Sequence, residues 1–236
     1  MNFINEEQIK FVSACVIQAL AYIREKEIIH RDIMMKNIVM DKDKYFNVID
    51  FSFSIEYKDK NNKKIFLNTY DMVSPPEMLN LSEYDYNSDY YRLGSIIYFL
   101  IFKTYPLIIK RNNNKTDIDI DYHKLKNYSK NCIDFMNKLI ISDYKKRIGF
   151  NDINELKKHS WFNGFNWKKL EKKEIISPFE FVPNINYEKC QKIEESSDVI
   201  VSFKKHTKKK FYLNLIKNFD YINIKIIKDY LREIKK

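Results

Sequence analysis

Three side chains that carry oxygen donors lie close together in the first quarter of this sequence. Asp32 follows a histidine and an arginine, Asn37 comes five residues later, and Asp50 comes eighteen residues after Asp32. Carboxylate and amide oxygens are hard ligands that suit magnesium, and a carboxylate can accept a proton from a hydroxyl group. Residues of these types could hold a divalent cation beside a proton acceptor, if the fold brings positions 32, 37 and 50 into one cleft.

The order and spacing of these residues carry a family resemblance. His30-Arg31-Asp32, followed by Asn37, resembles the catalytic loop of the eukaryotic protein kinases. Asp50-Phe51-Ser52 stands where that family has Asp-Phe-Gly, and Ser74-Pro75-Pro76-Glu77 stands where it has Ala-Pro-Glu. One such tripeptide alone would be weak evidence, but together and in this order the motifs make the sequence similar to protein kinases over about residues 3–183.

The resemblance implies a role for each member of the site. Asp32 would accept the proton of the substrate hydroxyl, while Asn37 and Asp50 would hold the magnesium ions that neutralise the triphosphate. Val39 would lie beneath the adenine ring. The expected cofactors are therefore ATP and Mg²⁺, and the expected partner is a protein substrate that offers a serine or threonine hydroxyl.

Other residues are expected to support this site. Asp89, in the stretch Ser88–Gly94, resembles the kinase aspartate that binds the backbone of the catalytic loop, although it could also be a helix N-cap. Arg147 resembles the arginine that pairs with the carboxylate of the Pro-Pro-Glu motif, which predicts a buried Arg147–Glu77 ion pair. The full set of expected supporting residues is His30, Arg31, Phe51, Thr69, Glu77, Asp89 and Arg147.

Two positions near the site depart from the family pattern. Serine/threonine kinases usually have a lysine two residues after the catalytic aspartate, and this sequence has Met34 there. Lys36, four residues after the aspartate, stands where tyrosine kinases have a basic residue. We therefore hypothesise that Lys36 contacts the transferred phosphate, the alternative being an ordinary solvated lysine. Ser52 replaces the glycine of the Asp-Phe-Gly motif, and its Cβ should restrict the backbone.

The elements that must position these residues are predicted to be mainly helical. Apolar residues at helical spacing and a suitable N-cap, Asn5, predict a helix over Glu6–Lys26. Ile38–Asp41 and Phe46–Ile49 are expected to be short strands joined by a turn. Long loops are expected over Phe51–Glu77 and Ile108–Asp121. Further helices are predicted over Asp89–Phe102, Asn131–Ser142, Asp152–His159 and Phe219–Ile234.

The expected fold is mainly α and resembles the C-terminal lobe of a protein kinase, a helical bundle with short β-hairpins at the catalytic loop. Only three glycines occur in the 236 residues, and they are scattered, so no glycine-rich phosphate loop is present. We therefore expect the N-terminal β-lobe to be absent, or supplied separately. The expected domains are the kinase C-terminal lobe at residues 1–162 and a tail at residues 163–236.

The tail narrows the resemblance to the AGC serine/threonine kinases. Phe165-Asn166-Trp167, Ile176–Phe179 and Val182-Pro183 are similar to the tail of that group, and the YANK-like kinases are the most similar. Ile216–Tyr221 resembles the hydrophobic motif of the group, although an ordinary helix face is an alternative. A basic segment, Lys204–Lys210, could contact a membrane.

Two functions remain open at this point. The first is ATP-dependent phosphoryl transfer to Ser/Thr hydroxyls, which this chain would not perform alone without a lobe that grips ATP. The alternative is a non-catalytic, pseudokinase-like module for protein interaction. The net charge is +10, but the lysines are spread along the chain and mixed with 32 acidic residues. No nucleic acid is therefore expected as a partner. Three scattered cysteines and a polar opening segment favour the cytoplasm.

Overall fold

The structure is a computed structural model of the 236-residue chain, and it describes residues 4–58, 74–81, 85–106, 108–110, 116–118 and 122–180. Compact packing divides the chain into Met1–Glu180 and Phe181–Lys236, and every described residue belongs to the first unit. The predictions made for Thr69, Val182-Pro183, Lys204–Lys210, Ile216–Tyr221 and Phe219–Ile234 lie outside the described residues. The boundary between residues 162 and 163 stays a prediction.

Helix α1, Glu6–Glu25, forms where the sequence predicts it. Asn5 is its N-cap and forms a capping box with Gln8, since each side chain accepts a hydrogen bond from the other residue's backbone N–H. The helix buries a nearly continuous apolar surface that includes Ile9, Val16 and Ile17, each 0% exposed. Alpha-helical periodicity and capping in the sequence were therefore sufficient to predict this element.

Strands β2, Ile38–Met40, and β3, Phe46–Val48, form the predicted antiparallel hairpin, with Ile38 opposite Val48. The loops predicted over Phe51–Glu77 and Ile108–Asp121 contain short strands, so those predictions were wrong in part, and strand β1 was not predicted at all. Strand β1, Ile28–Ile29, pairs with β4, Ile55–Glu56, and β5, Ile108–Lys110, pairs with β6, Thr116–Ile118. Strands of two or three residues are too short to show the alternating pattern that identifies a strand in a sequence.

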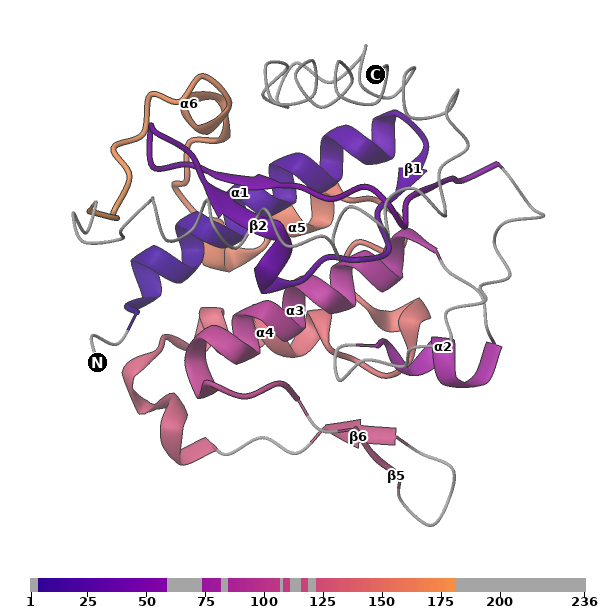
Figure 1. Cartoon of the computed structure of the whole chain (residues 1–236). Coiled ribbons are helices and arrows are strands. Elements are labelled where there is room, and N and C mark those ends of the chain that lie inside the picture. The colour runs from indigo at the N-terminus through magenta and orange to yellow at the C-terminus, as the bar shows by residue number, and fades with distance from the viewer. Residues whose placement is uncertain are drawn as a thin grey trace, which may run out of the picture. The chain divides into compact units, whose positions relative to one another are not determined.

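Helix α3, Tyr86–Phe102, is buried along nearly its whole length and contacts both α1 and α4, Lys130–Leu139 (Figure 1). It begins three residues before the predicted start, with Asp85 as its N-cap, so the alternative that Asp89 is the cap is wrong. Gly94 lets α3 approach α4 closely, because a Cβ at this position would lie 2.6 Å from Leu139 Cβ. The described part of α3 is thus a core helix.

The remaining described helices surround this core. They are α2 (Pro76–Leu81), α5 (Asn154–Lys158), α6 (Trp167–Glu171) and the 3₁₀ turns η1 (Met35–Asn37), η2 (Tyr122–Asn127), η3 (Tyr144–Lys146) and η4 (Ser160–Phe162). The mainly α character predicted from the sequence is confirmed for the described residues. Among the helices that the structure describes, none combines the length and apolar character that crossing a membrane requires.

Candidate active site

The structure places Asp32 and Asn37 in direct contact. Asn37 Nδ2 donates to Asp32 Oδ2 at 2.8 Å and to the Asp32 carbonyl at 2.9 Å. Both residues are buried, at 7% and 3% exposure, and η1 turns the chain between them. With its amide nitrogen committed to Asp32, Asn37 has its amide oxygen available as a ligand.

Asp50 follows strand β3 and lies at the same open end of the β2–β3 hairpin as Asn37. The backbone N–H of Ile49 donates to the Asn37 carbonyl at 2.9 Å, which extends the hairpin ladder to the residue before Asp50. Asp50 has a φ of +63°, in the left-handed region that residues with a side chain seldom adopt. Its Oδ1 accepts the backbone N–H of Ser52 at 3.2 Å. The hairpin therefore brings the backbone of positions 37 and 49–50 together.

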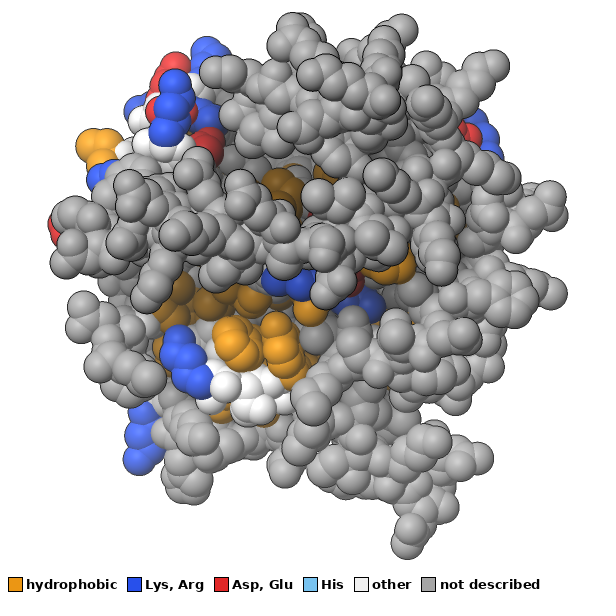
Figure 2. Space-filling view, in the orientation of Figure 1, with side chains coloured by type: hydrophobic (Ala, Val, Ile, Leu, Met, Phe, Trp, Pro, Cys, Tyr) orange, Lys and Arg blue, Asp and Glu red, His pale blue; other side chains and the backbone are white. Residues whose placement is uncertain are grey.

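Val39 lies on the exposed face of the hairpin, where a ligand could cover it. It is 39% exposed, and the neighbouring large apolar side chains Met40, Ile49 and Phe53 are 37–41% exposed. Figure 2 shows hydrophobic side chains reaching the surface in the centre of one face, beside lysine and arginine side chains. Exposed apolar side chains next to oxygen ligands fit a surface that another group covers.

Asp89 fixes the shape of the loop that carries Asp32. Its two carboxylate oxygens accept the backbone N–H groups of His30 at 2.8 Å and Arg31 at 2.9 Å. Arg31 has a φ of +69°, so the loop is held in a conformation that costs backbone energy. Asp89 is 1% exposed and lies in the first turn of α3, so a buried helix determines the loop geometry.

His30 connects the loop to the end of the hairpin. Its Nε2 lies 3.2 Å from the Ile49 carbonyl, its Nδ1 accepts the backbone N–H of Asp32 at 3.2 Å, and its ring lies 4.6 Å from the Phe51 ring. Burial lowers the pKa of His30 to about 4, and the neutral ring is the form that its contacts with Ile49 and Asp32 require.

Burial has the opposite effect on the neighbouring carboxyl group. It raises the pKa of Asp89 to about 6, although the two backbone hydrogen bonds of Asp89 act to lower that pKa.

Arg31 contacts the segment after Phe51, because its Nε donates to the carbonyl of Phe53. This contact joins the catalytic-loop region to the residues that lead into β4, Ile55–Glu56. Phe51 is half-buried, between Asp50 and this anchored stretch. Both Arg31 and Phe51 are half-buried, and their supporting roles stay predictions.

The predicted ion pair between Arg147 and Glu77 is present. Arg147 Nη1 and Nη2 donate to the two oxygens of Glu77 at 2.7 and 2.9 Å. The same guanidinium also donates to the carbonyls of Asn87 and Ile141, and Ser88 Oγ donates to Glu77. The arginine and glutamate side chains are 0% and 6% exposed. A buried charge pair with this many hydrogen bonds rigidly connects α2, α3 and the segment before η3.

Lys36 and Arg92 both place positive charge beside Asp32. Lys36 Nζ lies 3.6 Å from Asp32 Oδ2 and its side chain is 62% exposed, whereas Arg92 Nη1 lies 3.9 Å from Asp32 Oδ1 and its side chain is 2% exposed. Sequence reasoning identified Lys36 and missed Arg92. The available signal was an arginine directly before the apolar run of helix α3, since a buried charge requires a partner.

The candidate ligands for magnesium are one side-chain amide, that of Asn37, and one carboxylate, that of Asp50. Among the described residues, no group of three or more His, Cys, Asp or Glu side chains is placed to hold a metal ion. Asn37 and Asp50 offer the amide and carboxylate oxygens that Mg²⁺ accepts, and magnesium usually keeps several waters and phosphate oxygens as its other ligands. A cavity of about 440 Å³ near the start of α1 contains none of these residues in its lining.

Comparisons with known proteins agree with the family resemblance of the sequence motifs. Residues 1–162 match the family described as the protein kinase domain. Cyclic-GMP-dependent protein kinase 2 of Rattus norvegicus is 30% identical over 187 residues, which cover 74% of this chain and 24% of the rat protein. Serine/threonine-protein kinase sgk-1 of Caenorhabditis elegans is 31% identical over 179 residues, covering 74% of this chain and 38% of the nematode protein.

A plant relative gives the same result. Serine/threonine-protein kinase AtPK1/AtPK6 of Arabidopsis thaliana is 27% identical over 188 residues, which cover 78% of this chain and 40% of the plant protein. The chain therefore spans between about a quarter and two fifths of the curated relatives named here. All of these relatives carry the words protein kinase in their names.

Proposed function

Because this chain belongs to the protein kinase family, we propose that it carries the catalytic loop and metal ligands of an AGC-like kinase that phosphorylates serine or threonine in proteins. The observation that supports this most directly is the contact between Asp32 and Asn37, on a loop whose backbone is bonded to Asp89. The C-terminal lobe with its tail is the part of a kinase that we assign to this chain. The YANK-like subgroup remains our more detailed hypothesis.

Each residue of the site has a defined task in this proposal. Asp32 accepts the proton of the hydroxyl acceptor, and Asn37 and Asp50 hold magnesium through their side-chain oxygens. ATP with its magnesium ions, when bound, supplies the phosphoryl group and neutralises its negative charge. Val39, half-exposed on the hairpin, offers an apolar surface for the adenine.

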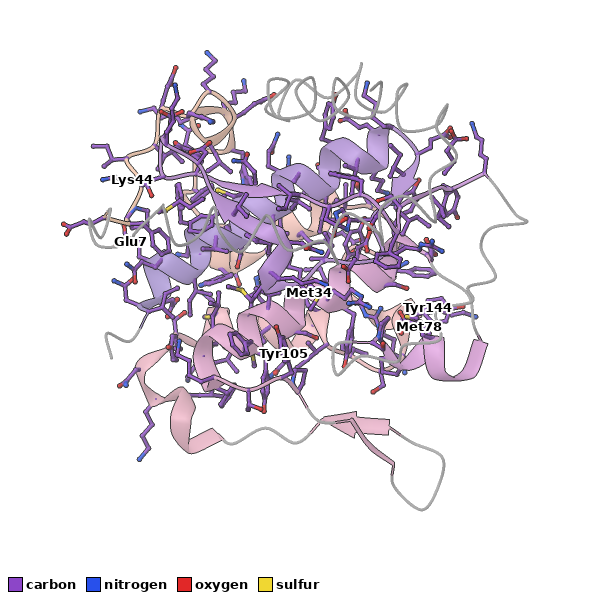
Figure 3. All side chains as sticks on the ribbon, viewed as in Figure 1. Glu7, Met34, Lys44, Met78, Tyr105 and Tyr144 are labelled. Atoms are coloured by element: carbon purple, nitrogen blue, oxygen red, sulfur yellow. The ribbon has the colours of Figure 1, made fainter. Side chains whose placement is uncertain are left out.

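Two cations flank the carboxylate of Asp32 and orient it. Asn37 and Lys36 lie at Oδ2, and Arg92 lies at Oδ1, so the two oxygens face different partners. Lys36 is the exposed cation of the pair and can reach a phosphate above the loop, which compensates for Met34 at the position where a lysine is usual. Figure 3 labels Met34 near the centre of the view, directly before η1.

The rest of the nucleotide cleft has to come from another surface. Positioning and exclusion of water require groups on both sides of the transferred phosphate, and Val39, on the hairpin beside the proposed ligands, is 39% exposed. We propose that an N-terminal kinase lobe covers this side. Under this proposal the chain alone is inactive, and its partners are that lobe and a protein substrate in the cytoplasm.

A chimera tests the proposed function. The chain is joined behind the N-terminal lobe of the nematode relative, and transfer of ³²P from ATP to a serine-containing peptide is measured. We expect transfer by the chimera, a loss of about 10²–10⁴-fold in Asp32→Asn because the proton acceptor is removed, and a smaller loss in Lys36→Ala. Glu25→Gln, at an exposed carboxylate at the end of α1, is the control and should keep full activity.

Nucleotide binding by the chimera separates the two possible functions. If the chimera binds a fluorescent ATP analogue but transfers no phosphate, the enzyme proposal is wrong and the non-catalytic interaction module becomes the better assignment. If transfer occurs and Lys36→Ala leaves its rate unchanged, only the task given to Lys36 is wrong.

A further inference from the structure

Residues 173–179, which we call the strap, lie across the turn of the β2–β3 hairpin. Lys173 Nζ lies 2.5 Å from Asp41 Oδ2 and 3.4 Å from Asp43 Oδ2, and the two carboxylates belong to that turn. Both members of the closer pair are half-buried, with the lysine side chain 32% and the Asp41 side chain 21% exposed. Burial alone would raise the pKa of Asp41, but its hydrogen bonds with Lys173 and with turn groups lower it.

Tyr45 gives the strap a second, neutral attachment. Its hydroxyl donates to the carbonyl of Ile175 at 2.6 Å and accepts the N–H of the same residue at 2.9 Å. Two residues further on, Ser177 Oγ donates to the carbonyl of Lys44 at 2.8 Å. Alternate residues of the strap, Lys173, Ile175 and Ser177, therefore all contact the turn that joins β2 to β3.

Apolar contacts continue the attachment along α1. The ring of Phe179 packs edge-on against Phe46 of β3 at 4.9 Å, and Phe11 of α1 lies within 6.5 Å of both rings. Gln8 Nε2, also on α1, donates to the carbonyl of Pro178 at 3.1 Å. The hairpin is thus held between the strap and α1, over a sequence separation of about 130 residues.

The opposite end of the same hairpin carries the proposed cation ligands. Asn37 immediately precedes β2, and Asp50 follows the end of β3 by two residues. A two-stranded hairpin with three-residue strands is at best marginally stable by itself in water. Figure 3 labels Lys44 in the turn and Met34 beside the open end of the hairpin. An element this weak needs an external contact to hold both of its ends in place.

We propose that the strap is a positioning element for the cation site: by fixing the turn of the β2–β3 hairpin, it holds Asn37 and Asp50 at the separation that a shared divalent cation requires. Tyr45 and Lys173 are the positioning residues, and neither touches the cation. The identity of the site rests on the proposed function, whereas the attachment of the strap to the hairpin does not. Loosening the strap should therefore loosen the far end of the hairpin and weaken cation binding.

The test uses the full chain in solution and compares Tyr45→Phe with Tyr128→Phe. Tyr45→Phe keeps the buried ring and removes both hydroxyl contacts with the strap. Tyr128→Phe is the matched control, since it removes a half-buried hydroxyl that donates to the carbonyl of Ile4 at 3.3 Å, away from the hairpin. Lys173→Met and its exposed neighbour Lys172→Met provide a second matched pair.

Hydrogen exchange of the Ile49 amide reports the far end of the hairpin. In Tyr45→Phe and Lys173→Met we expect this amide to exchange about tenfold faster than in the unmodified chain, as the loss of ordinary hydrogen bonds predicts. The two control variants should leave its rate unchanged. An unchanged Ile49 rate in Tyr45→Phe would overturn the strap proposal.

Manganese alone, titrated into the chain, reports the cation site through paramagnetic broadening of the Asn37 side-chain NH₂ signal. We expect Tyr45→Phe to need several-fold more Mn²⁺ for equal broadening, while Tyr128→Phe matches the unmodified chain. Faster Ile49 exchange with unchanged Mn²⁺ affinity would overturn the positioning role. If the unmodified chain shows no broadening, the cation site of the proposed function is wrong, and Ile49 exchange still decides whether the strap fixes the hairpin.

Discussion

Arg147 and Glu77 show how much of a site depends on residues that never touch a substrate. The pair is buried and bidentate, and it joins two residues that are 70 positions apart in the sequence. The guanidinium of Arg147 also donates to two backbone carbonyls. Both charges are almost entirely removed from water, so neither of them can be lost without leaving the other uncompensated. The sequence predicted this pair because both partners lie in recognisable motifs.

Substitution of Arg147 by methionine tests that reasoning. We expect Arg147→Met to lower the free energy of unfolding by about 3–5 kcal/mol, because Glu77 is left as an unpaired buried carboxylate. Urea denaturation measures the loss. Lys146→Met, which removes an exposed ion pair at 3.5 Å in the neighbouring position, is the control and should have little effect. A loss in Arg147→Met no larger than in the control would contradict the prediction.

His30 predicts a specific dependence of stability on pH. The pKa of His30 is lowered to about 4 by burial, from 6.5 in an exposed histidine. As the pH falls from 6.5 to 4, the unfolded chain takes up a proton that the folded protein excludes, so stability falls by as much as about 3 kcal/mol. Urea unfolding of the unmodified protein and of His30→Asn between pH 4 and 7 measures this.

The difference between those two proteins isolates the histidine. The pKa of Asp89 is raised to about 6, which changes stability in the opposite direction over part of the same range, but Asp89 is present in both proteins. We expect the unmodified protein to lose stability relative to His30→Asn on acidification below pH 6.5. A constant difference across this range would show that His30 titrates normally in the folded state.

At the scale of elements, helices were easier to predict than strands. The helix α1 and the hairpin β2–β3 follow from apolar spacing, an N-cap and a turn, because the information lies within about twenty residues. The pair β1–β4 joins residues 28–29 to residues 55–56, so no local pattern reports it. The start of α3 was placed late because Asp89, which looks like a cap, binds the catalytic loop instead.

Gly94 determines how closely α3 and α4 pack. We expect Gly94→Ala to lower the free energy of unfolding by about 1–3 kcal/mol, since its Cβ would lie 2.6 Å from Leu139 Cβ and 2.7 Å from Ile140 Cγ2. Urea denaturation gives the loss, and the methyl chemical shifts of Leu139 and Ile140 report the displacement of α4. Gly164→Ala serves as the comparison, because its φ of +77° strains the backbone while no atom lies within 4 Å.

The two glycine variants should differ in which signals they change. Gly164→Ala should be destabilised by backbone strain alone and should leave the Leu139 and Ile140 methyl shifts unmoved. Unchanged methyl shifts in Gly94→Ala would contradict the close approach of the two helices at this position.

For the whole molecule, the motifs were sufficient to predict the family, but they did not predict all of the contacts that surround the candidate site. His30, Asp32, Asn37, Asp50 and Glu77 were identified as a set, because the order of short motifs carries that information. Arg92 was missed, and so were the contacts from Lys173 and Ile175 to the hairpin turn. These contacts join segments more than 50 residues apart, and their residue types are common on any surface, so only the fold shows them.

The backbone bonds from Asp89 to His30 and Arg31 also have a consequence for biosynthesis. The catalytic loop is translated well before α3, and its left-handed residue at position 31 is held by a carboxylate that arrives 58 residues later. During translation the loop therefore stays unformed until α3 has left the ribosome and docked. A nascent chain that stalls before residue 89 would expose the loop without its cation site.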